Sequence, residues 1–140
     1  MSSELQQKLT STINIGIVCT AYSNGAFMDY VRNNLNNIGK LVIAKTGVKN
    51  LKILASTFDL AIEYESNGHG FISYSEELTK KISNLNSYCL SSKDILTLEL
   101  LSAYIALYNP TVGDSLSNIV AMECGMKFFK YLLCFGIYLW

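Results

Sequence analysis

Three side chains in one short segment could together bind a polar ligand: Glu65, Asn67 and His69, which fall within five positions of segment 65–70. A carboxylate, an amide and an imidazole supply hydrogen-bond acceptors and donors that suit the paired hydroxyls of a sugar. Two glycines in the same segment give the backbone the freedom to bring these groups together. The alternative is a polar hairpin turn that carries an exposed histidine.

A second segment, 45–49, has the composition of an anion-binding turn. Its sequence is Lys-Thr-Gly-Val-Lys, and it lies between an expected strand and the helix that follows. Backbone N–H groups at the start of that helix, together with Lys45 and Lys49, could hold a phosphate or a polar sugar group. The alternative is a capped helix, with Thr46 as its cap and two solvated lysines.

Metal coordination is not expected from the residue types present. His69 is the only histidine, and the four cysteines (Cys19, Cys89, Cys124 and Cys134) are widely spaced, without a CxxC pair. One histidine without a partner cluster gives too few ligands for zinc. We interpret the cysteines as reduced thiols of a cytoplasmic protein.

The composition limits the class of protein. A chain of 140 residues fits one domain, and 50% apolar against 16% charged residues exclude disorder for most of its length. With 11 basic and 11 acidic side chains and no basic run, nucleic acid is not an expected partner. Residues 1–12 are polar and lack the basic start and apolar stretch of a signal peptide, so secretion is not expected. The apolar, aromatic segment 128–140 is shorter than the roughly 20 residues of a membrane-spanning helix, so no transmembrane span is expected.

Hydrophobic spacing predicts the elements that position the two polar segments. Apolar runs predict four short strands, at 13–19, 41–44, 60–64 and 71–74, the last of which turns back as a hairpin. Helical spacing predicts helices at 27–38 with Asn24 as cap and Gly39 as terminator, at 48–58, at 78–85, at 92–108 as a buried helix, and after Asp114. This order predicts an α/β fold, a small mixed β-sheet flanked by helices. Both polar segments then lie at the edge where parallel strands end.

Four segments together resemble one known family. They are Thr-Ala-Tyr-Ser-Asn-Gly at 20–25, the 45–49 segment, Phe-Asp-Leu-Ala-Ile-Glu-Tyr-Glu-Ser-Asn-Gly-His-Gly at 58–70, and Gly-Asp-Ser-Leu-Ser-Asn at 113–118. They resemble the third domain of the phosphoacetylglucosamine mutases, a branch of the α-D-phosphohexomutase superfamily. The motif Glu-x-Asn-Gly-His-Gly is the most specific, because other branches typically carry serine at the asparagine position. The resemblance spans 13–123.

The resemblance implies a sugar-binding domain at 13–123 of a four-domain cytoplasmic isomerase. That enzyme interconverts N-acetylglucosamine 6-phosphate and N-acetylglucosamine 1-phosphate, a step towards UDP-N-acetylglucosamine, through a phosphoserine and Mg²⁺ bound outside this chain. Carried over by position, Glu65 and Asn67 would hold the sugar hydroxyls, with His69 beside them. Thr46 and Gly47 would contribute contacts from the neighbouring loop. None of these five residues is expected to be catalytic, and none is the nucleophile.

Three family motifs have no match in this sequence: the Thr-Ala-Ser-His-Asn-Pro nucleophile loop, the Asp-Gly-Asp-Ala-Asp-Arg metal loop and the Arg-Pro-Ser-Gly-Thr-Glu phosphate loop. They belong to the other domains. Because phosphoryl transfer needs cationic stabilisation of the transferring group, this chain alone is expected to be inactive. The remaining mutase domains are expected partners if the chain is a truncated piece.

The two ends of the chain fall outside the resemblance. Residues 1–12 are interpreted as a polar N-terminal extension, and 124–140 as an apolar tail that is either the product of a truncated gene or a closing element of the domain. Two other classes of function remain open. One is a non-catalytic module that binds sugar phosphates or a protein partner, and the other is a membrane-associated protein anchored by 128–140.

Overall fold

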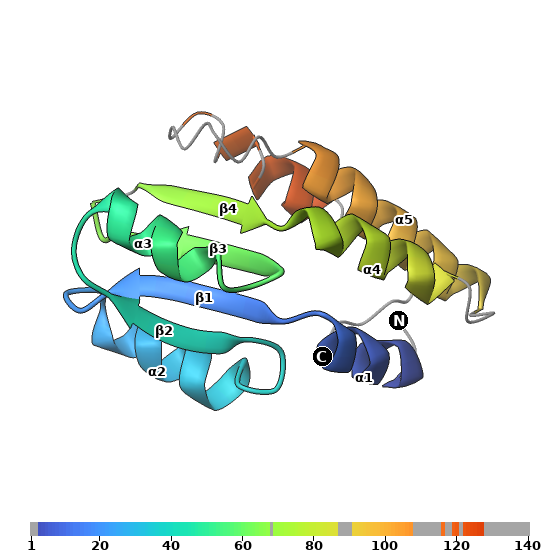
Figure 1. Ribbon diagram of the computed structural model, residues 1–140, viewed down its shortest axis with the longest axis horizontal. Helices are drawn as coiled ribbons and strands as arrows, with labels where there is room; N and C mark the ends of the chain where they lie inside the picture. Colours follow the sequence, from blue (N-terminus) through green and yellow to red (C-terminus); the bar gives the residue numbers. More distant parts are fainter. Residues whose placement is uncertain are drawn as a thin grey trace.

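Four strands form a single mixed sheet in the computed structural model, which describes residues 3–67, 69–86, 91–107, 116, 119–120 and 122–127. The strands are β1 (Ile15–Thr20), β2 (Lys40–Ala44), β3 (Leu60–Tyr64) and β4 (Gly70–Tyr74), and their order in the sheet is β2-β1-β3-β4. β1 pairs in parallel with β2 and β3, whereas β4 is antiparallel to β3. The expected α/β fold with a small mixed sheet is therefore confirmed (Figure 1).

Five helices accompany the sheet in the described ranges: α1 (Ser3–Thr12), α2 (Gly25–Asn34), α3 (Val48–Ala55), α4 (Glu76–Asn86) and α5 (Ser92–Leu107). α2 and α3 connect the parallel strands, and α3 lies against β1 and β3. α2 reaches the other face, where Phe27 contacts Tyr64 with ring centroids 5.7 Å apart. α4 and α5 lie side by side beyond the end of β4, with α1 nearby (Figure 1).

The buried apolar side chains form two separate clusters. The sheet core lies between α3 and the strands and comprises Val18, Ala44, Leu51, Ala55, Phe58 and Ala61. The helical core joins α1, α4 and α5 and comprises Leu5, Ile13, Leu78, Ile82, Leu85, Leu98 and Ile105. In the sheet core, Phe58 packs directly over Gly16, where an added Cβ would overlap the phenyl ring.

The N-terminal segment differs from the expected polar extension. It contains α1, whose Leu5 is 0% exposed and belongs to the helical core. Leu5 and Leu9 are its only leucines, and they are four positions apart, which is a weak amphipathic signal among polar neighbours. The apolar run predicted as a strand from residue 13 is divided, because Ile13 donates its N–H to Leu9 O at the end of α1 and β1 begins at Ile15.

The end of α2 was predicted too far along the chain. Asn24 caps the helix as predicted, since its Oδ1 accepts from Ala26 N over 2.8 Å, but the helix ends at Asn34 rather than near Gly39. The N–H groups of Ile38 and Gly39 both bond to Leu35 O, 2.9 Å away in each case. Residues 35–39 therefore form a turn and not a further turn of the helix, although Leu35 and Ile38 keep the helical spacing of apolar residues. Ile38 is 40% exposed.

α5 is less buried than its composition predicted. Leu98 and Ile105 lie in the helical core, but Ile95, Leu96 and Leu107 are exposed. Among the described residues, α5 packs on α4 and joins α1 in the helical core, and these three side chains lie away from that contact. Helical residues also occur at 116, 119–120 and 122–127, while the predicted cap Asp114 and the segment 128–140 lie outside the described residues. No helix among the described ranges is long and apolar enough to cross a bilayer.

Candidate functional site

The two polar segments singled out in the sequence meet at one edge of the sheet. Segment 45–47 follows β2 and segment 65–69 follows β3, and both strands run parallel to β1, which lies between them. The backbone N–H of Gly47 donates to Glu65 Oε1 over 3.1 Å. A hydrogen bond between backbone and side chain therefore joins the two loops.

Glu65 is the buried centre of this arrangement, with only 5% of its surface exposed. Its second carboxylate oxygen, Oε2, accepts from Asn67 Nδ2 over 3.4 Å, and its backbone N–H donates to His69 O over 2.9 Å. An ionised carboxylate has about four acceptor positions, and the bonds from Gly47 N–H and Asn67 Nδ2 use one on each oxygen. Each oxygen can still accept a hydrogen bond from a ligand hydroxyl.

Asn67 and His69 are exposed, unlike Glu65. Asn67 Oδ1 accepts from the backbone N–H of His69 over 3.1 Å, which fixes the turn between β3 and β4. The His69 side chain lies at the surface beside the carboxylate loop. The described residues 65–67 and 69 thus connect the antiparallel strands β3 and β4, with a buried carboxylate at the base of the connection.

Gly47, and not Thr46, is the N-cap of α3, which corrects the capping expectation. Gly47 has φ +111° and ψ 131°, a conformation open in practice to glycine alone, and it offers no side-chain cap. Thr46 is exposed, and its carbonyl oxygen accepts from Asn50 Nδ2 over 2.8 Å. Lys45 and Lys49 are also exposed, so two cations flank this loop.

A third loop, 20–25, reaches the same place from the end of β1. Ser66 Oγ donates to Tyr22 O over 3.3 Å, and Thr20 and Ser23 are buried with their hydroxyl oxygens 3.4 Å apart. The sequence predicts a helix cap at Asn24 in this segment but gives no signal that places Tyr22 at the site. The loops after β1, β2 and β3 therefore converge at one edge.

A second buried carboxylate, Glu63, lies in β3 next to the site and was missed from the sequence. It is 1% exposed, Ser73 Oγ donates to its Oε1, and its Oε2 has no hydrogen-bond partner among the described residues. Burial raises the pKa of the Glu63 carboxyl, and this outweighs the lowering by the Ser73 hydrogen bond and by the charge of Lys52. The sequence does contain a signal for this buried carboxylate, because Glu63 is the one charged residue in the apolar strand predicted at 60–64.

Metal-binding clusters do not occur in the part of the chain that the structure describes. No group of three or more His, Cys, Asp or Glu side chains comes together there. The Cys19 and Cys124 thiols are free, and Cys89 and Cys134 lie outside the described residues. The site as described consists of hydrogen-bonding groups and flanking lysines.

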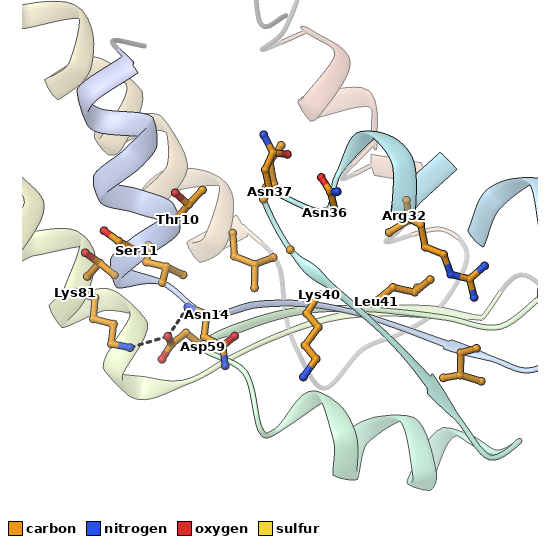
Figure 2. Close-up of a pocket in the computed structure, with 17 residues that line it drawn as sticks. Thr10, Ser11, Asn14, Arg32, Asn36, Asn37, Lys40, Leu41, Asp59 and Lys81 are labelled. Atoms are coloured by element: carbon orange, nitrogen blue, oxygen red, sulfur yellow. Dashed lines mark hydrogen bonds and ion pairs between the residues drawn. The ribbon is translucent and has the colours of Figure 1, made fainter. Parts of the chain in front are cut away.

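A pocket of about 660 Å³ lies at the opposite edge of the sheet, where β1 and β2 begin (Figure 2). Its polar lining includes Arg32, Lys40 and the Lys81–Asp59 ion pair, in which Nζ and Oδ2 are 2.6 Å apart. Figure 2 shows Arg32 and Lys81 on opposite sides of the pocket. The cations therefore do not converge on one point. The site residues predicted from the sequence do not line this pocket.

Comparison with known proteins matches most of the chain to one family. The family model described as phosphoacetylglucosamine mutase AMG1, domain III, matches residues 1–131. The phosphoacetylglucosamine mutase of Saccharomyces cerevisiae is 37% identical over 123 residues, 87% of this chain and 22% of the relative. The enzyme of Homo sapiens is 34% identical over 122 residues, 86% of this chain and 22% of the relative.

Solved structures give the same result for the fold. The Aspergillus fumigatus N-acetylphosphoglucosamine mutase superposes with a TM-score of 0.75 at 35% identity, over 86% of this chain and 22% of that one. An N-acetylglucosamine-phosphate mutase of the α-D-phosphohexomutase superfamily, in its substrate complex, gives 0.75 at 31% identity, over 91% and 24%. The chain thus spans about 22% of the length of these curated relatives.

Proposed function

Because this chain belongs to the family of domain III of phosphoacetylglucosamine mutase, we propose that it is the sugar-recognition domain of such an enzyme. The enzyme would interconvert N-acetylglucosamine 6-phosphate and N-acetylglucosamine 1-phosphate, the step that leads to UDP-N-acetylglucosamine. The observation that carries the proposal is the buried Glu65 carboxylate, which accepts from the loop after β2 in a segment that also bonds to the loop after β1.

The proposed contacts follow from the groups present. Glu65 accepts hydrogen bonds from the sugar hydroxyls, and the amide of Asn67 both accepts from them and donates to them. His69 borders the same ring. Thr46 and Gly47 contribute from the neighbouring loop. A buried carboxylate that is already held in place binds hydroxyls without first losing side-chain freedom, which favours affinity.

The chemistry of the whole enzyme would come from the remaining mutase domains. Phosphoacetylglucosamine mutases are isomerases, and structures of the Aspergillus fumigatus enzyme hold GlcNAc-6P with magnesium or glucose-1,6-bisphosphate. In the proposal, Mg²⁺ and the phosphoserine belong to those domains, so this chain supplies sugar contacts and no catalytic group. We place it in the cytoplasm, with its cysteines reduced.

An NMR titration of the 140-residue chain with N-acetylglucosamine 6-phosphate tests the proposal. We expect amide shifts at Gly47, Glu65 and His69, and weaker binding by Glu65→Ala. Asp29→Ala, an exposed carboxylate on α2, is the matched control and should bind like the unaltered chain. Shifts confined to the pocket at Arg32 and Lys40, or the same shifts with inorganic phosphate alone, would contradict sugar recognition by the 65–69 loop.

A further inference from the structure

Asn50, in the first turn of α3, contacts the peptide group that holds Glu65. Its Nδ2 donates to the carbonyl oxygen of Thr46, and the N–H of the same peptide group, on Gly47, donates to Glu65 Oε1. We propose that Asn50 is a positioning residue of the candidate sugar site, which acts on the Glu65 carboxylate through the peptide between residues 46 and 47. The inference rests on the proposed function for the identity of the ligand.

The geometry of this peptide group explains how Asn50 acts at a distance. A trans peptide is planar, and its C=O and N–H point in opposite directions. The amide of Asn50 holds the C=O at 2.8 Å, while Glu65 takes the N–H at 3.1 Å. A rotation of the plane that breaks one bond therefore weakens the other, and Asn50 fixes the direction in which the N–H points.

Gly47 makes such an anchor necessary. Glycine has the widest range of backbone conformations, so a peptide that precedes it rotates easily unless something holds it. A Cβ at Gly47 would lie 3.6 Å from Asn50 Nδ2, which is an ordinary contact, so the φ of +111° rather than space requires glycine here. The loop thus combines a flexible residue with a side chain that restrains it.

The hydrogen bond from Asn50 serves the loop and not the helix. α3 already begins with the backbone N–H groups of Asn50 and Leu51 bonded to Gly47 O, at 2.8 and 3.3 Å. Thr46 O lies before the helix and adds nothing to its ladder. Alanine also has a higher helix propensity than asparagine, so Asn50→Ala should leave α3 intact and remove only the restraint on the loop.

Hydrogen exchange of the Gly47 amide, measured by NMR on the full chain, tests the first step. In Asn50→Ala we expect this amide to exchange about three- to tenfold faster, the loss expected for one net hydrogen bond. Asn34→Ala is the matched control, because Asn34 Nδ2 also donates to a carbonyl four positions earlier, Tyr30 O, at 3.0 Å. It should leave Gly47 unchanged.

Binding of N-acetylglucosamine 6-phosphate tests the second step. Asn50→Ala should raise the Kd about three- to tenfold, and Asn34→Ala should not change it. In a Glu65→Ala background, Asn50→Ala should add less than about twofold, because residues that act through one another are not additive. An equal added loss in both backgrounds would mean that Asn50 acts independently of Glu65 and would overturn the proposal.

The two measurements separate the possible failures. If the unaltered chain does not bind the sugar phosphate, the proposed function fails, and the exchange rate of Gly47 still decides whether Asn50 positions the peptide. Unchanged exchange at Gly47 in Asn50→Ala counts against the inference. Faster exchange spread over Leu51 to Ala55 would also count against it, because the variant would then loosen the helix as a whole.

Discussion

Glu63 is a buried carboxyl next to the site, with only 1% of its surface exposed. It lies on the α3 side of β3, with Ser73 on one oxygen and no partner on the other among the described residues. A buried charge without full hydrogen bonding is costly, which is why burial raises the pKa of this carboxyl. The raised pKa means that the folded chain holds the proton more tightly than the unfolded chain.

Glu63→Gln should therefore stabilise the protein at neutral pH, by about 1 kcal/mol. The contribution of Glu63 to stability is fully present below the ordinary Glu pKa of 4.5 and is lost as pH rises through the raised value. The difference in free energy of unfolding between Glu63→Gln and the unaltered chain should therefore grow as pH rises from 4.5 through the raised pKa of Glu63. Urea denaturation between pH 4 and pH 8 measures this, with the exposed Glu99→Gln as control. Parallel pH profiles for all three proteins would show that Glu63 is not the cause.

Asp59 has the opposite pH dependence. Burial opposes its ionised form, but hydrogen bonds from Lys81, the Asn14 N–H and Ser75, with the Lys81 charge, outweigh this and lower the pKa of its carboxyl. Its stabilisation is present above the ordinary value of 3.8 and is lost as pH falls through the lowered value.

Replacing Asp59 by Asn should lower the free energy of unfolding at pH 7 by about 1.5–3 kcal/mol, because hydrogen bonds to a charged, largely buried group are lost. Asp29→Asn is the matched control. Its ion pair with Arg32 has side chains 69% and 51% exposed, and such pairs contribute about 0–1 kcal/mol. Denaturation curves of equal midpoint for the two variants would refute this difference.

Among the elements, those with regular patterns and clear ends were predictable from the sequence. The third strand was predicted at 60–64, as observed for β3, and Leu78, Ile82 and Leu85 on α4 are all buried. On α4, the apolar residues recur with the helical period of 3.6 residues, and these residues lie on the buried face. The edge at which the polar segments gather was also predictable, because parallel strands end together.

The remaining features depend on tertiary contacts that a local pattern does not contain. α1 was missed because two leucines among polar residues become a core position only when α4 and α5 pack on them. The roles of Asn50 and Glu63 were missed for the same reason, since each depends on a partner from another loop or strand. The side chain of Thr46 favours it as the N-cap of α3, but in the structure Gly47 occupies the N-cap position.

α1 should prove to be an integral element of the fold. Leu5→Ala removes a fully buried side chain from the helical core, and such substitutions cost about 2–5 kcal/mol. Leu107→Ala, at a position on α5 that is 53% exposed, should change stability by less than about 0.5 kcal/mol. Thermal unfolding followed by circular dichroism compares them. A Leu5→Ala protein as stable as the control would mean that α1 is dispensable.

For the whole molecule, the proposed function assigns sugar recognition to this chain and phosphoryl transfer to other domains. The described residues bring together a carboxylate and amides but no group of metal ligands, and the chain spans about 22% of its curated relatives. We therefore expect the isolated chain to have no mutase activity.

A coupled assay with Mg²⁺, a catalytic amount of sugar bisphosphate and N-acetylglucosamine 6-phosphate checks this expectation. Product formation should equal that of a blank without protein. A full-length relative, such as the Saccharomyces cerevisiae enzyme, serves as positive control. Turnover by the purified chain that disappears in Glu65→Ala would show that the chain carries a complete active site of its own.

The packing of Phe58 over Gly16 also limits how this sequence can diverge. Any side chain at position 16 would occupy the space of the phenyl ring, so a side chain gained at position 16 requires a smaller residue at position 58. In a collection of homologous sequences, we expect glycine at the first to accompany a large ring at the second, and a small residue at the second wherever the first has gained a side chain. A search for stabilised variants by random mutagenesis should accordingly recover a change of Gly16 only together with a change of Phe58.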